Sequence, residues 1–314
     1  MQQLTVINME KNPLVSVIVN CFNSEKYLFE TLKSLVSQEY QNWELIFFDN
    51  QSTDNSKKIY DLFKDKRFKY YYSEKHTNLV LARHYALQKI NGDFFCYLDA
   101  DDFWMPKKLS TQIPLLIDGK AGFVYSNSIC FNDNNKERIL FSDEMPSGNI
   151  YSDLLDNYFL PDETVIFSKK ILLEQGIKLD KNLNYIPNFD LSMQYAIISE
   201  AIYCNKVLSK WRVNNTSLTW RKNKEIYHDI NNWLRKQKKK ESNSYIKKKI
   251  SKAINKNHLR YARSLLIEHG NVKTIKFLLL HFNINISFFI MFFISCIPLA
   301  PNFLRFRRKK LFLN

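Results

Sequence analysis

The sequence is poor in glycine. It holds six glycines in 314 residues, and none lies before Gly92. Dinucleotide-binding GxGxxG loops and Walker-type phosphate loops both need glycines where the backbone approaches a phosphate closely. Both loops are therefore excluded. Any phosphate chemistry must rely on carboxylates and a metal ion rather than on a glycine cradle.

Paired cysteines are also missing. The five cysteines lie far apart in the chain and form no CxxC pair. A zinc site or a disulfide framework is therefore not expected, and we interpret the cysteines as reduced thiols in a cytosolic compartment. Residues 1–13 contain no apolar stretch of the kind found in signal peptides, so no secretory signal is expected.

Acidic residues are scarce towards the C-terminus. Residues 221–260 hold 14 Lys or Arg against 3 Asp or Glu, and residues 301–314 hold 5 basic residues and no acidic one. The net charge of the whole chain is +15, so residues 1–220 form a mildly acidic body. A nucleic-acid-binding protein would be expected to be uniformly basic, whereas here the basic residues are confined to the C-terminal part. No nucleic-acid-binding motif is present. We therefore predict no nucleic-acid partner.

Short apolar runs alternate with amphipathic segments through the first hundred residues. The expected strands cover 14–19, 45–48, 68–72 and 94–98, and the expected helices cover 28–36, 52–63 and 79–90. Runs rich in β-branched and aromatic residues are typical of buried parallel strands. This alternation predicts an α/β fold with a mostly parallel, Rossmann-like sheet flanked by helices.

Polar residues follow three of these strands directly. They are the segment 20–23, Asp49 and the segment 99–102. In open α/β sheets, ligands bind in the crevice outside the carboxyl ends of the strands. For Asp49 alone, a role in a turn or a helix cap is an equally good interpretation. Three such strand ends together favour a binding site.

The acidic cluster Asp99-Ala100-Asp101-Asp102 has a chemistry of its own. Crowded carboxylates raise one another's pKa, so they add little to the stability of the fold. A hard divalent cation reverses that penalty, because Mg²⁺ and Mn²⁺ prefer oxygen ligands, often carboxylates together with substrate phosphates. Such a metal neutralises the charge that develops on a diphosphate leaving group. The cluster therefore predicts Mn²⁺ or Mg²⁺ as a cofactor.

An ordered series of motifs runs through this part of the chain. The motifs are Val15-Ser16-Val17-Ile18-Val19 with Phe22-Asn23, Ser34-Leu35 with Gln38, Trp43-Glu44-Leu45-Ile46, Asp49-Asn50-Gln51-Ser52-Thr53-Asp54, Ala82-Arg83, Asn91-Gly92-Asp93 and Leu98-Asp99-Ala100-Asp101-Asp102 with Pro106. In this order and spacing they resemble the donor-binding half of glycosyltransferase family 2, which has the GT-A fold. A weaker resemblance extends through Phe189-Asp190-Leu191 and Trp211-Arg212-Val213 to Thr216-Ser217.

The resemblance implies roles for individual residues. The nucleotide-sugar-binding residues that it implies are Cys21, Phe22, Asn23, Asp49, Arg83 and Asp99. The loop 21–23 and Asp49 would hold the nucleobase, and Arg83 would lie near the nucleotide or its phosphates. Asp99 would face the ribose and the metal ion, and Asp101 would ligate the metal ion that bridges the diphosphate.

Members of the family invert the anomeric carbon in one displacement and use a carboxylate to deprotonate the acceptor hydroxyl. The usual position of this base is Asn188 here, which cannot take a proton. We therefore nominate Asp190 as the catalytic base, with a helix-start role as the alternative. Other departures are Asn50 and Gln51, where Asp and Gly are usual, and Asn214 in place of a common histidine.

The C-terminal region differs from the body. Residues 277–304 contain no charged residue, although Asn and Pro interrupt them, and basic residues flank them on both sides. We predict a segment that enters one leaflet or lies along it, with a true membrane span as the alternative. The lysines of 236–249 would then face anionic lipid. The other interpretation of these lysines is a solvated helix face.

These observations predict three regions: a GT-A domain over 1–220 (donor half 13–106, acceptor half 107–220), a basic helical region over 221–270, and a membrane-associating segment over 271–314. The expected activity is transfer of a sugar from a nucleotide-sugar donor, with a UDP-sugar favoured, to a glycan or lipid-linked acceptor in surface polysaccharide biosynthesis. The enzyme would be peripheral or monotopic on the cytoplasmic side of the cell membrane. Alternatives are a catalytically impaired, membrane-bound nucleotide-sugar-binding protein and a sugar-phosphate nucleotidyltransferase.

Overall fold

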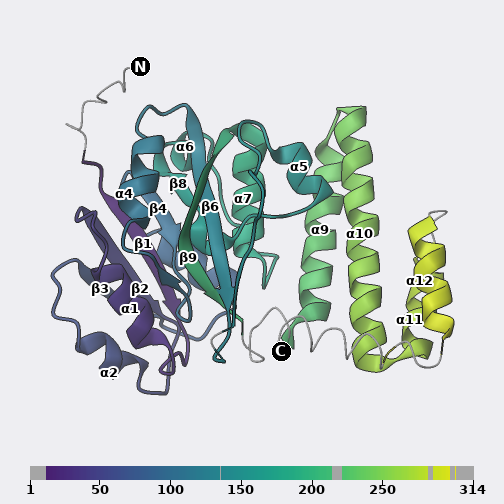
Figure 1. The fold of residues 1–314 in the computed structure, drawn as a ribbon, viewed down its shortest axis with the longest axis horizontal. Coiled ribbons are helices and arrows are strands. Elements are labelled where there is room, and N and C mark those ends of the chain that lie inside the picture. The colour runs from purple at the N-terminus through teal and green to yellow at the C-terminus, as the bar shows by residue number, and fades with distance from the viewer. Residues whose placement is uncertain (1–11, 135, 214–220, 282–285, 298–300, 302–314) are drawn as a thin grey trace.

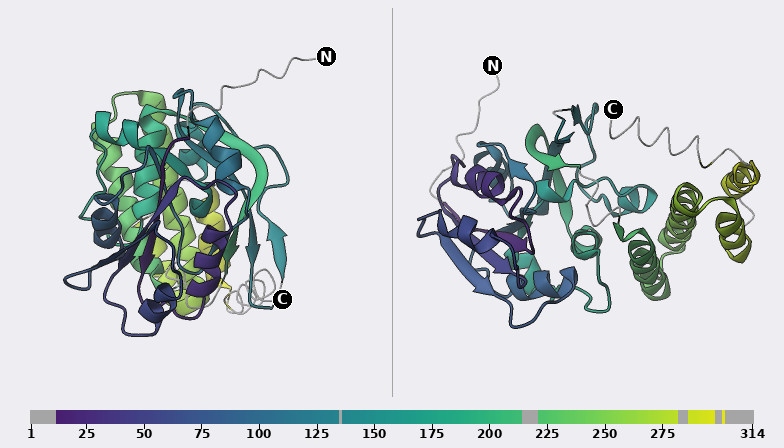
Figure 2. Two further views of the ribbon diagram at one scale, coloured as in Figure 1. Left: turned by 90° about the vertical axis from the view of Figure 1, so that its left-hand side faces the viewer. Right: turned by 90° about the horizontal axis from the view of Figure 1, so that it is seen from below.

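A computed structural model describes residues 12–134, 136–213, 221–281, 286–297 and 301. Its body is a nine-stranded sheet with helices on both faces, and a group of C-terminal helices stands beside the body (Figure 1). Seen from below, α11 and α12 lie at the end of the molecule opposite the first strands (Figure 2). The predicted α/β GT-A-like fold with a helical C-terminal region is confirmed.

The first part of the chain forms the parallel half of the sheet. Its strands are β1 (Val15–Cys21), β2 (Trp43–Asp49), β3 (Phe68–Tyr72) and β4 (Phe94–Tyr97), in the order β3-β2-β1-β4. The helices α1 (Leu28–Val36), α2 (Ser56–Asp61) and α3 (Leu79–Leu87) connect them. All three pairings are parallel, so the carboxyl ends of β1, β2 and β4 lie at one edge of the sheet.

The second part of the chain makes the sheet mixed. Its elements are β5 (Phe103–Trp104), α4 (Lys108–Gln112), η1 (Ile113–Leu115), β6 (Ala121–Phe131), β7 (Glu137–Ile139), α5 (Tyr151–Asp156), η2 (Asp162–Thr164), β8 (Ile166–Ser168), α6 (Lys169–Glu174), α7 (Pro187–Ile198) and β9 (Glu200–Arg212). Strand β8 pairs antiparallel to both β4 and β6, whereas β9 runs parallel to β6 and antiparallel to β5.

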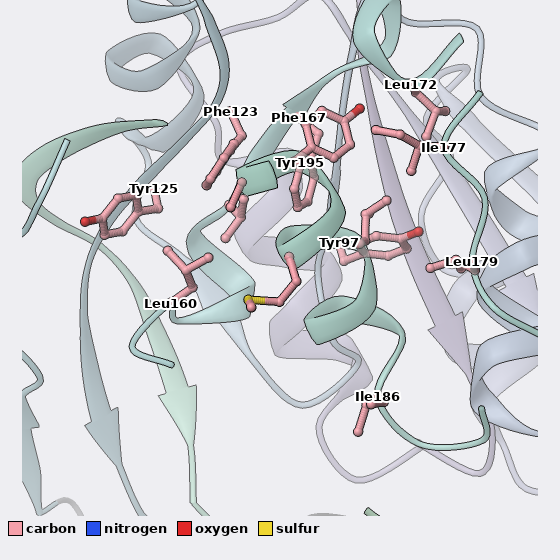
Figure 3. Close-up of a cluster of buried hydrophobic side chains, with 14 of the residues drawn as sticks. Tyr97, Phe123, Tyr125, Leu160, Phe167, Leu172, Ile177, Leu179, Ile186 and Tyr195 are labelled. Carbon is pink, nitrogen blue, oxygen red and sulfur yellow. The ribbon is translucent and has the colours of Figure 1, made fainter. Parts of the chain in front are cut away.

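Two hydrophobic clusters cover the two faces of the sheet. On one face, alternate residues of β1 and β2 pack against the apolar stripe of α1. On the other face, α3, α5 and α7 pack over the sheet, and Trp233 and Ile250 of the C-terminal helices reach the same cluster. Phe167 and Tyr195 pack against each other in this cluster, with their ring centroids 4.8 Å apart and the rings tilted by 52° (Figure 3). Because these strands are buried on both faces, most residues of β1 and β2 are apolar.

The helix expected over 52–63 is shorter than predicted, and it begins only at Ser56. The four residues before it bind the neighbouring loop instead. The carboxylate of Asp54 accepts hydrogen bonds from the backbone N–H groups of Glu25 and Ser56, and the N–H of Asn55 donates to Glu25. Ser, Thr, Asp and Asn side chains often form such hydrogen bonds with nearby backbone groups, which favours turns over helix interiors.

The C-terminal helices are α9 (Asn223–Lys240), α10 (Ser244–His269), α11 (Asn271–Leu280) and α12 (Ile286–Cys296). Asn243 caps α10, since its side chain accepts hydrogen bonds from the N–H groups of Tyr245 and Ile246. Among the residues that the structure describes, no helix is both long and apolar enough to cross a membrane. The basic residues predicted to flank the apolar segment at 305–310 lie outside the described residues.

Candidate active site

A cavity of about 1290 Å³ opens at the carboxyl edge of the parallel strands. The structure places most of the predicted site residues around it. They are Cys21, Phe22, Asn23, Arg83, Asp99 and Asp101. The remaining walls come from η2 and the segment before it, from the start of α7, and from α9 and α10. The cavity is therefore bounded by the parallel half of the sheet on one side and by the later elements on the other.

Two loops at this edge hold each other in place. The N–H of Asn23 donates to Oγ of Ser52 at 3.0 Å, and Oδ1 of Asn23 accepts from the N–H of Thr53 at 2.8 Å. Asn23 and Gln51 both have a positive φ, of 51° and 69°. Asparagine tolerates this region, whereas Gln51 adopts it where the resemblance had suggested a glycine. Its side chain is held by the carbonyls of residues 73 and 74.

Phe22 presents an aromatic surface at the cavity. Its ring is 48% exposed and lies 4.2 Å, centroid to centroid, from the ring of His76. Nδ1 of His76 is 2.9 Å from the carbonyl oxygen of Asn50, which fixes the position of the imidazole. A planar base can stack on such a surface whatever its hydrogen-bonding pattern.

Asp49 lies beneath this loop rather than in the cavity wall. The side chain is buried, and its two carboxylate oxygens accept from the N–H of Ser52 at 2.7 Å and the hydroxyl of Tyr70 at 2.7 Å. The neighbouring Asn50 lines the cavity, and its side chain binds the backbone of Thr77. In this arrangement Asp49 supports the loop, and its contact with a nucleobase stays a prediction.

Arg83 and Asp99 form an ion pair at the cavity. Nη2 of Arg83 donates to Oδ1 of Asp99 at 2.5 Å, and the guanidinium lies over the ring of Tyr97. The Arg83 side chain is only 3% exposed, whereas that of Asp99 is 47% exposed. Nε and Nη1 of Arg83 are buried and have no hydrogen-bond partner in the part of the chain that the structure describes. Buried, unpaired donors of a cation are costly, so this pair is well suited to an anionic ligand.

Asp102 belongs to the fold of the acidic loop rather than to its open face. Its carboxylate is buried and accepts the N–H of Arg212 at 2.8 Å. Burial, together with the neighbouring carboxylates of Asp101 and Glu163, raises the pKa of Asp102 well above its usual value. This side chain thus anchors the acidic loop to the end of β9.

The side chain of Arg212 also contacts the acidic loop. Its Nε donates to the carbonyl oxygen of Asp101 at 3.0 Å, and its two terminal nitrogens bind Glu30 at 2.5 Å and Asp133 at 3.0 Å. The side chain is 7% exposed. One guanidinium therefore connects the acidic loop with the segments around Glu30 and Asp133 and with the end of β9. The planar guanidinium can donate hydrogen bonds to several oxygen acceptors at once.

Asp190 does not reach the cavity that holds Asp99. Its carboxylate accepts three hydrogen bonds, from the N–H of Asp180 at 2.8 Å, Nε2 of Gln194 at 2.9 Å and Nε1 of Trp233 at 2.8 Å. It lines a second, smaller cavity, and burial raises its pKa. The geometry gives Asp190 a structural role that joins α7 to α9. Its nomination as the base stays a prediction.

Asp162 and Glu163 also line the main cavity, and neither was among the residues predicted from the sequence. Asp162 and Glu163 form the start of η2, a single turn between the acidic loop and Asn188. Neither residue directly follows a strand of the parallel half of the sheet. The search for polar residues at the ends of predicted strands therefore could not select them. The only signal in the sequence was two adjacent acids after a proline in an otherwise apolar stretch.

The residues present fit a divalent cation bound together with substrate. Within the described residues, no group of three or more His, Cys, Asp or Glu side chains is placed to hold a metal ion by itself. Asp99 and Asp101 nevertheless line the same cavity. Mg²⁺ and Mn²⁺ commonly use one or two carboxylates and complete their shell with substrate phosphates and water. The position of the missing histidine, Asn214, lies outside the described residues.

Comparison with known proteins agrees with this geometry. The family model for glycosyl transferase family 2 matches residues 16–175, which cover β1 to β8 and the acidic loop. The chain belongs to glycosyl transferase family 2. It is therefore a glycosyltransferase that uses a nucleotide sugar.

Individual relatives of this family 2 glycosyltransferase are similar over most of their length. An Escherichia coli relative, UDP-Glc:alpha-D-GlcNAc-diphosphoundecaprenol beta-1,3-glucosyltransferase WfgD, is 29% identical over 217 residues, which cover 68% of this chain and 82% of the relative. Among solved structures, Staphylococcus aureus TarS 1–349 in complex with UDP-GlcNAc matches with a TM-score of 0.62 at 17% identity, covering 90% of this chain and 79% of that one. The mannosyltransferase PcManGT of Pyrobaculum calidifontis, in complex with GDP-Man and Mn²⁺, matches with a TM-score of 0.59 at 15% identity, covering 96% and 89%. At these identities the two structures show the fold.

Proposed function

We propose that this enzyme transfers a sugar from a UDP-sugar to a lipid-linked glycan acceptor, with inversion at the anomeric carbon, in the synthesis of a surface polysaccharide. The relative WfgD, whose name specifies UDP-glucose and a diphosphoundecaprenol-linked acceptor, supports both the donor and the acceptor class. The observation that carries the proposal is the single cavity that joins the loop at Phe22, the Arg83–Asp99 pair and Asp101.

The cavity is large enough for donor and acceptor together. Its volume of about 1290 Å³ exceeds the roughly 300–1,000 Å³ usual for one small ligand. In the proposed complex, the base stacks on Phe22, and the diphosphate lies near the Arg83–Asp99 pair. The remaining space, bounded by η2 and the start of α7, receives the acceptor hydroxyl. Holding both reactants in one cavity converts an encounter in solution into a reaction between positioned groups.

A divalent cation would be held by Asp99 and Asp101 together with the donor diphosphate, and it would stabilise the negative charge on the leaving group. The positive charge of the Arg83 guanidinium, which pairs with Asp99, would stabilise the same negative charge. Because Asp102 is fixed by Arg212, the loop that carries Asp101 does not need to reorganise when the donor binds.

The test is a panel of UDP-, GDP- and CMP-sugars scored for nucleotide release with a bacterial membrane extract as acceptor, in Mn²⁺ and in EDTA. We expect release from a UDP-sugar that depends on both the extract and the metal. Binding of a UDP-sugar without release would favour the nucleotide-sugar-binding protein. Release of pyrophosphate from a nucleoside triphosphate and a sugar phosphate would identify a nucleotidyltransferase.

We further propose that the enzyme docks on the cytoplasmic face of an anionic membrane through α11 and α12. These helices leave a set of large apolar side chains exposed, namely Val272, Leu279, Leu280, Ile290 and Phe293, and Ile297 is exposed directly after α12. Lys273 and Lys276 are exposed on α11 itself, and the preceding segment 221–260 is strongly basic. Apolar residues beside basic ones are typical of helices that lie in the interface of anionic bilayers.

This docking predicts a measurable loss on substitution. Leu280 is 73% exposed and Phe293 is 66% exposed. Changing both to aspartate should lower binding to vesicles that contain phosphatidylglycerol by at least about tenfold, because each side chain contributes roughly 1.5–3 kcal/mol when it leaves water. Cosedimentation measures the binding. Leu62→Asp, at an equally exposed leucine after α2, is the matched control and should bind like the wild type. Equal binding by all three proteins would contradict the proposal.

A further inference from the structure

The acceptor hydroxyl needs a proton acceptor on the cavity side of the sheet, and the usual position holds Asn188. Asn188 lies at the start of α7 and lines the main cavity. Its side chain acts to lower the pKa of Asp162, while its Oδ1 is buried and has no hydrogen-bond partner among the described residues. Asn188 and Asp162 therefore come from different elements and line the same cavity, which is proposed to receive the acceptor.

Asp162 is fixed in position by the residues around it. Its Oδ1 accepts the hydroxyl of Tyr158 at 2.8 Å. The η2 turn is held from below, since the carbonyl of Glu163 accepts Nε1 of Trp104 at 2.9 Å and the carbonyl of Thr164 accepts Nζ of Lys108 at 2.8 Å. Asp162 itself is partly exposed and faces the cavity, whereas Glu163 and Thr164 beside it are buried. A carboxylate on such a rigid support is preorganised for proton transfer.

From this geometry we propose that Asp162 is the catalytic base of the transfer reaction and that Asn188 positions it. The inference rests on the proposed function. In the step, the acceptor oxygen forms a bond to the anomeric carbon of the donor, and the bond from that carbon to the diphosphate oxygen breaks. The diphosphate leaves with the electron pair, and the hydroxyl proton passes to the Asp162 carboxylate, which later releases it to water.

The electrostatic surroundings suit this role. Burial raises the pKa of Asp162 to about 6, whereas the hydroxyl of Tyr158, the charge of Arg83 and the side chain of Asn188 act to lower it. The negative charge of Asp99 also acts to raise this pKa, and Glu163 is the adjacent acid on the same turn. A base with a pKa close to the working pH is ionised and still basic enough to take a proton. By comparison, the carboxylate of Asp190 accepts hydrogen bonds from three protein donors outside this cavity.

The test compares Asp162→Asn, Asp190→Asn and Asp153→Asn with the wild type, using the donor that turns over in the panel. Asp153 is exposed on α5 and does not line the cavity, so it controls for the loss of one negative charge nearby. We expect Asp162→Asn to lower kcat by roughly 10²–10⁴-fold, the range for loss of a general base. UDP binding by calorimetry and the melting temperature should both stay close to those of the wild type. Asp153→Asn should keep wild-type kcat.

The pH profile separates catalysis from structure. For the wild type, log(kcat/KM) should fall with a slope of one below about pH 6, because protonation removes the base. Asp162→Asn should lose this acid limb, and Asp162→Glu should recover part of kcat. If Asp162→Asn keeps more than half of the wild-type kcat, or if Asp190→Asn alone shows the loss with normal UDP binding, the assignment is overturned. A wild type that releases no nucleotide from any donor would contradict the proposed function itself. A wild type that turns over, with an Asp162→Asn variant that turns over equally well, would contradict only the assignment of the base.

Discussion

Replacing Asp101 by alanine is expected to lower metal-dependent kcat/KM by roughly 10²–10³-fold, the range seen when one preorganised electrostatic contact to a developing charge is removed. Asp101 lines the cavity beside Asp99, and its backbone is held by Arg212. The substitution removes the carboxylate and leaves the backbone contact in place. The catalytic loss should therefore occur without loss of the fold, and steady-state kinetics in a Mn²⁺ titration measures it.

The control for this substitution is Asp118→Ala. Asp118 is an exposed aspartate on a surface turn outside the cavity, with Lys120 nearby at 3.5 Å. Exposed pairs of this kind contribute little to stability, so the control should keep both activity and melting temperature. If Asp101→Ala retains near-normal activity at saturating Mn²⁺, Asp101 is not a ligand of the catalytic metal.

Arg83→Ala is expected to raise the KM for the donor by roughly 10–150-fold. Arg83 lines the cavity, and its guanidinium pairs with Asp99 and has two further buried donors without a hydrogen-bond partner among the described residues. Hydrogen bonds to a charged group contribute about 1.5–3 kcal/mol, and each 1.4 kcal/mol corresponds to a factor of ten. Arg83→Lys should not restore binding, because an ammonium group cannot bind Asp99 and a diphosphate through one planar fork.

Arg67→Ala is the matched control for Arg83→Ala. The Arg67 guanidinium also stacks on an aromatic ring, with 3.6 Å from its central carbon to the centroid of Trp43, and it pairs with Asp65. It lies outside the cavity. Its loss should lower the melting temperature and leave the donor KM unchanged. A similar rise in KM for both variants would mean that Arg83 acts through stability rather than through donor contact.

The first four strands could be predicted because their signal is local. Each is a short apolar run bounded by polar residues, and Phe68–Tyr72 is the same in prediction and structure. The parallel arrangement then brings the loop at Asn23 and the loop at Asp99 to one edge, as expected. Arg83 was found through the family resemblance, since nothing in its local sequence indicates a buried ion pair with Asp99.

The acceptor side could not be predicted in the same way. Asp162 lies on a one-turn helix after Pro161, and its contacts with Tyr158 and Asn188 depend on the packing of α7 against the sheet. The sequence interpretation therefore chose Asp190, the nearest acid to the usual base position. The structure turns that carboxylate towards Trp233. Two residues along a helix separate two faces, and only the tertiary fold decides which face meets the cavity.

The bond between Arg212 and Asp102 has a consequence for how the protein is made. It joins residues 110 positions apart, and the contact of Arg212 with Glu30 spans 182 positions. Such contacts form only after a long stretch of chain has closed on itself. A nascent chain that ends before Arg212 lacks the contacts that this residue makes with the acidic loop. The acidic loop therefore gains these contacts only after β9 has been synthesised, which ties its final shape to a late stage of translation.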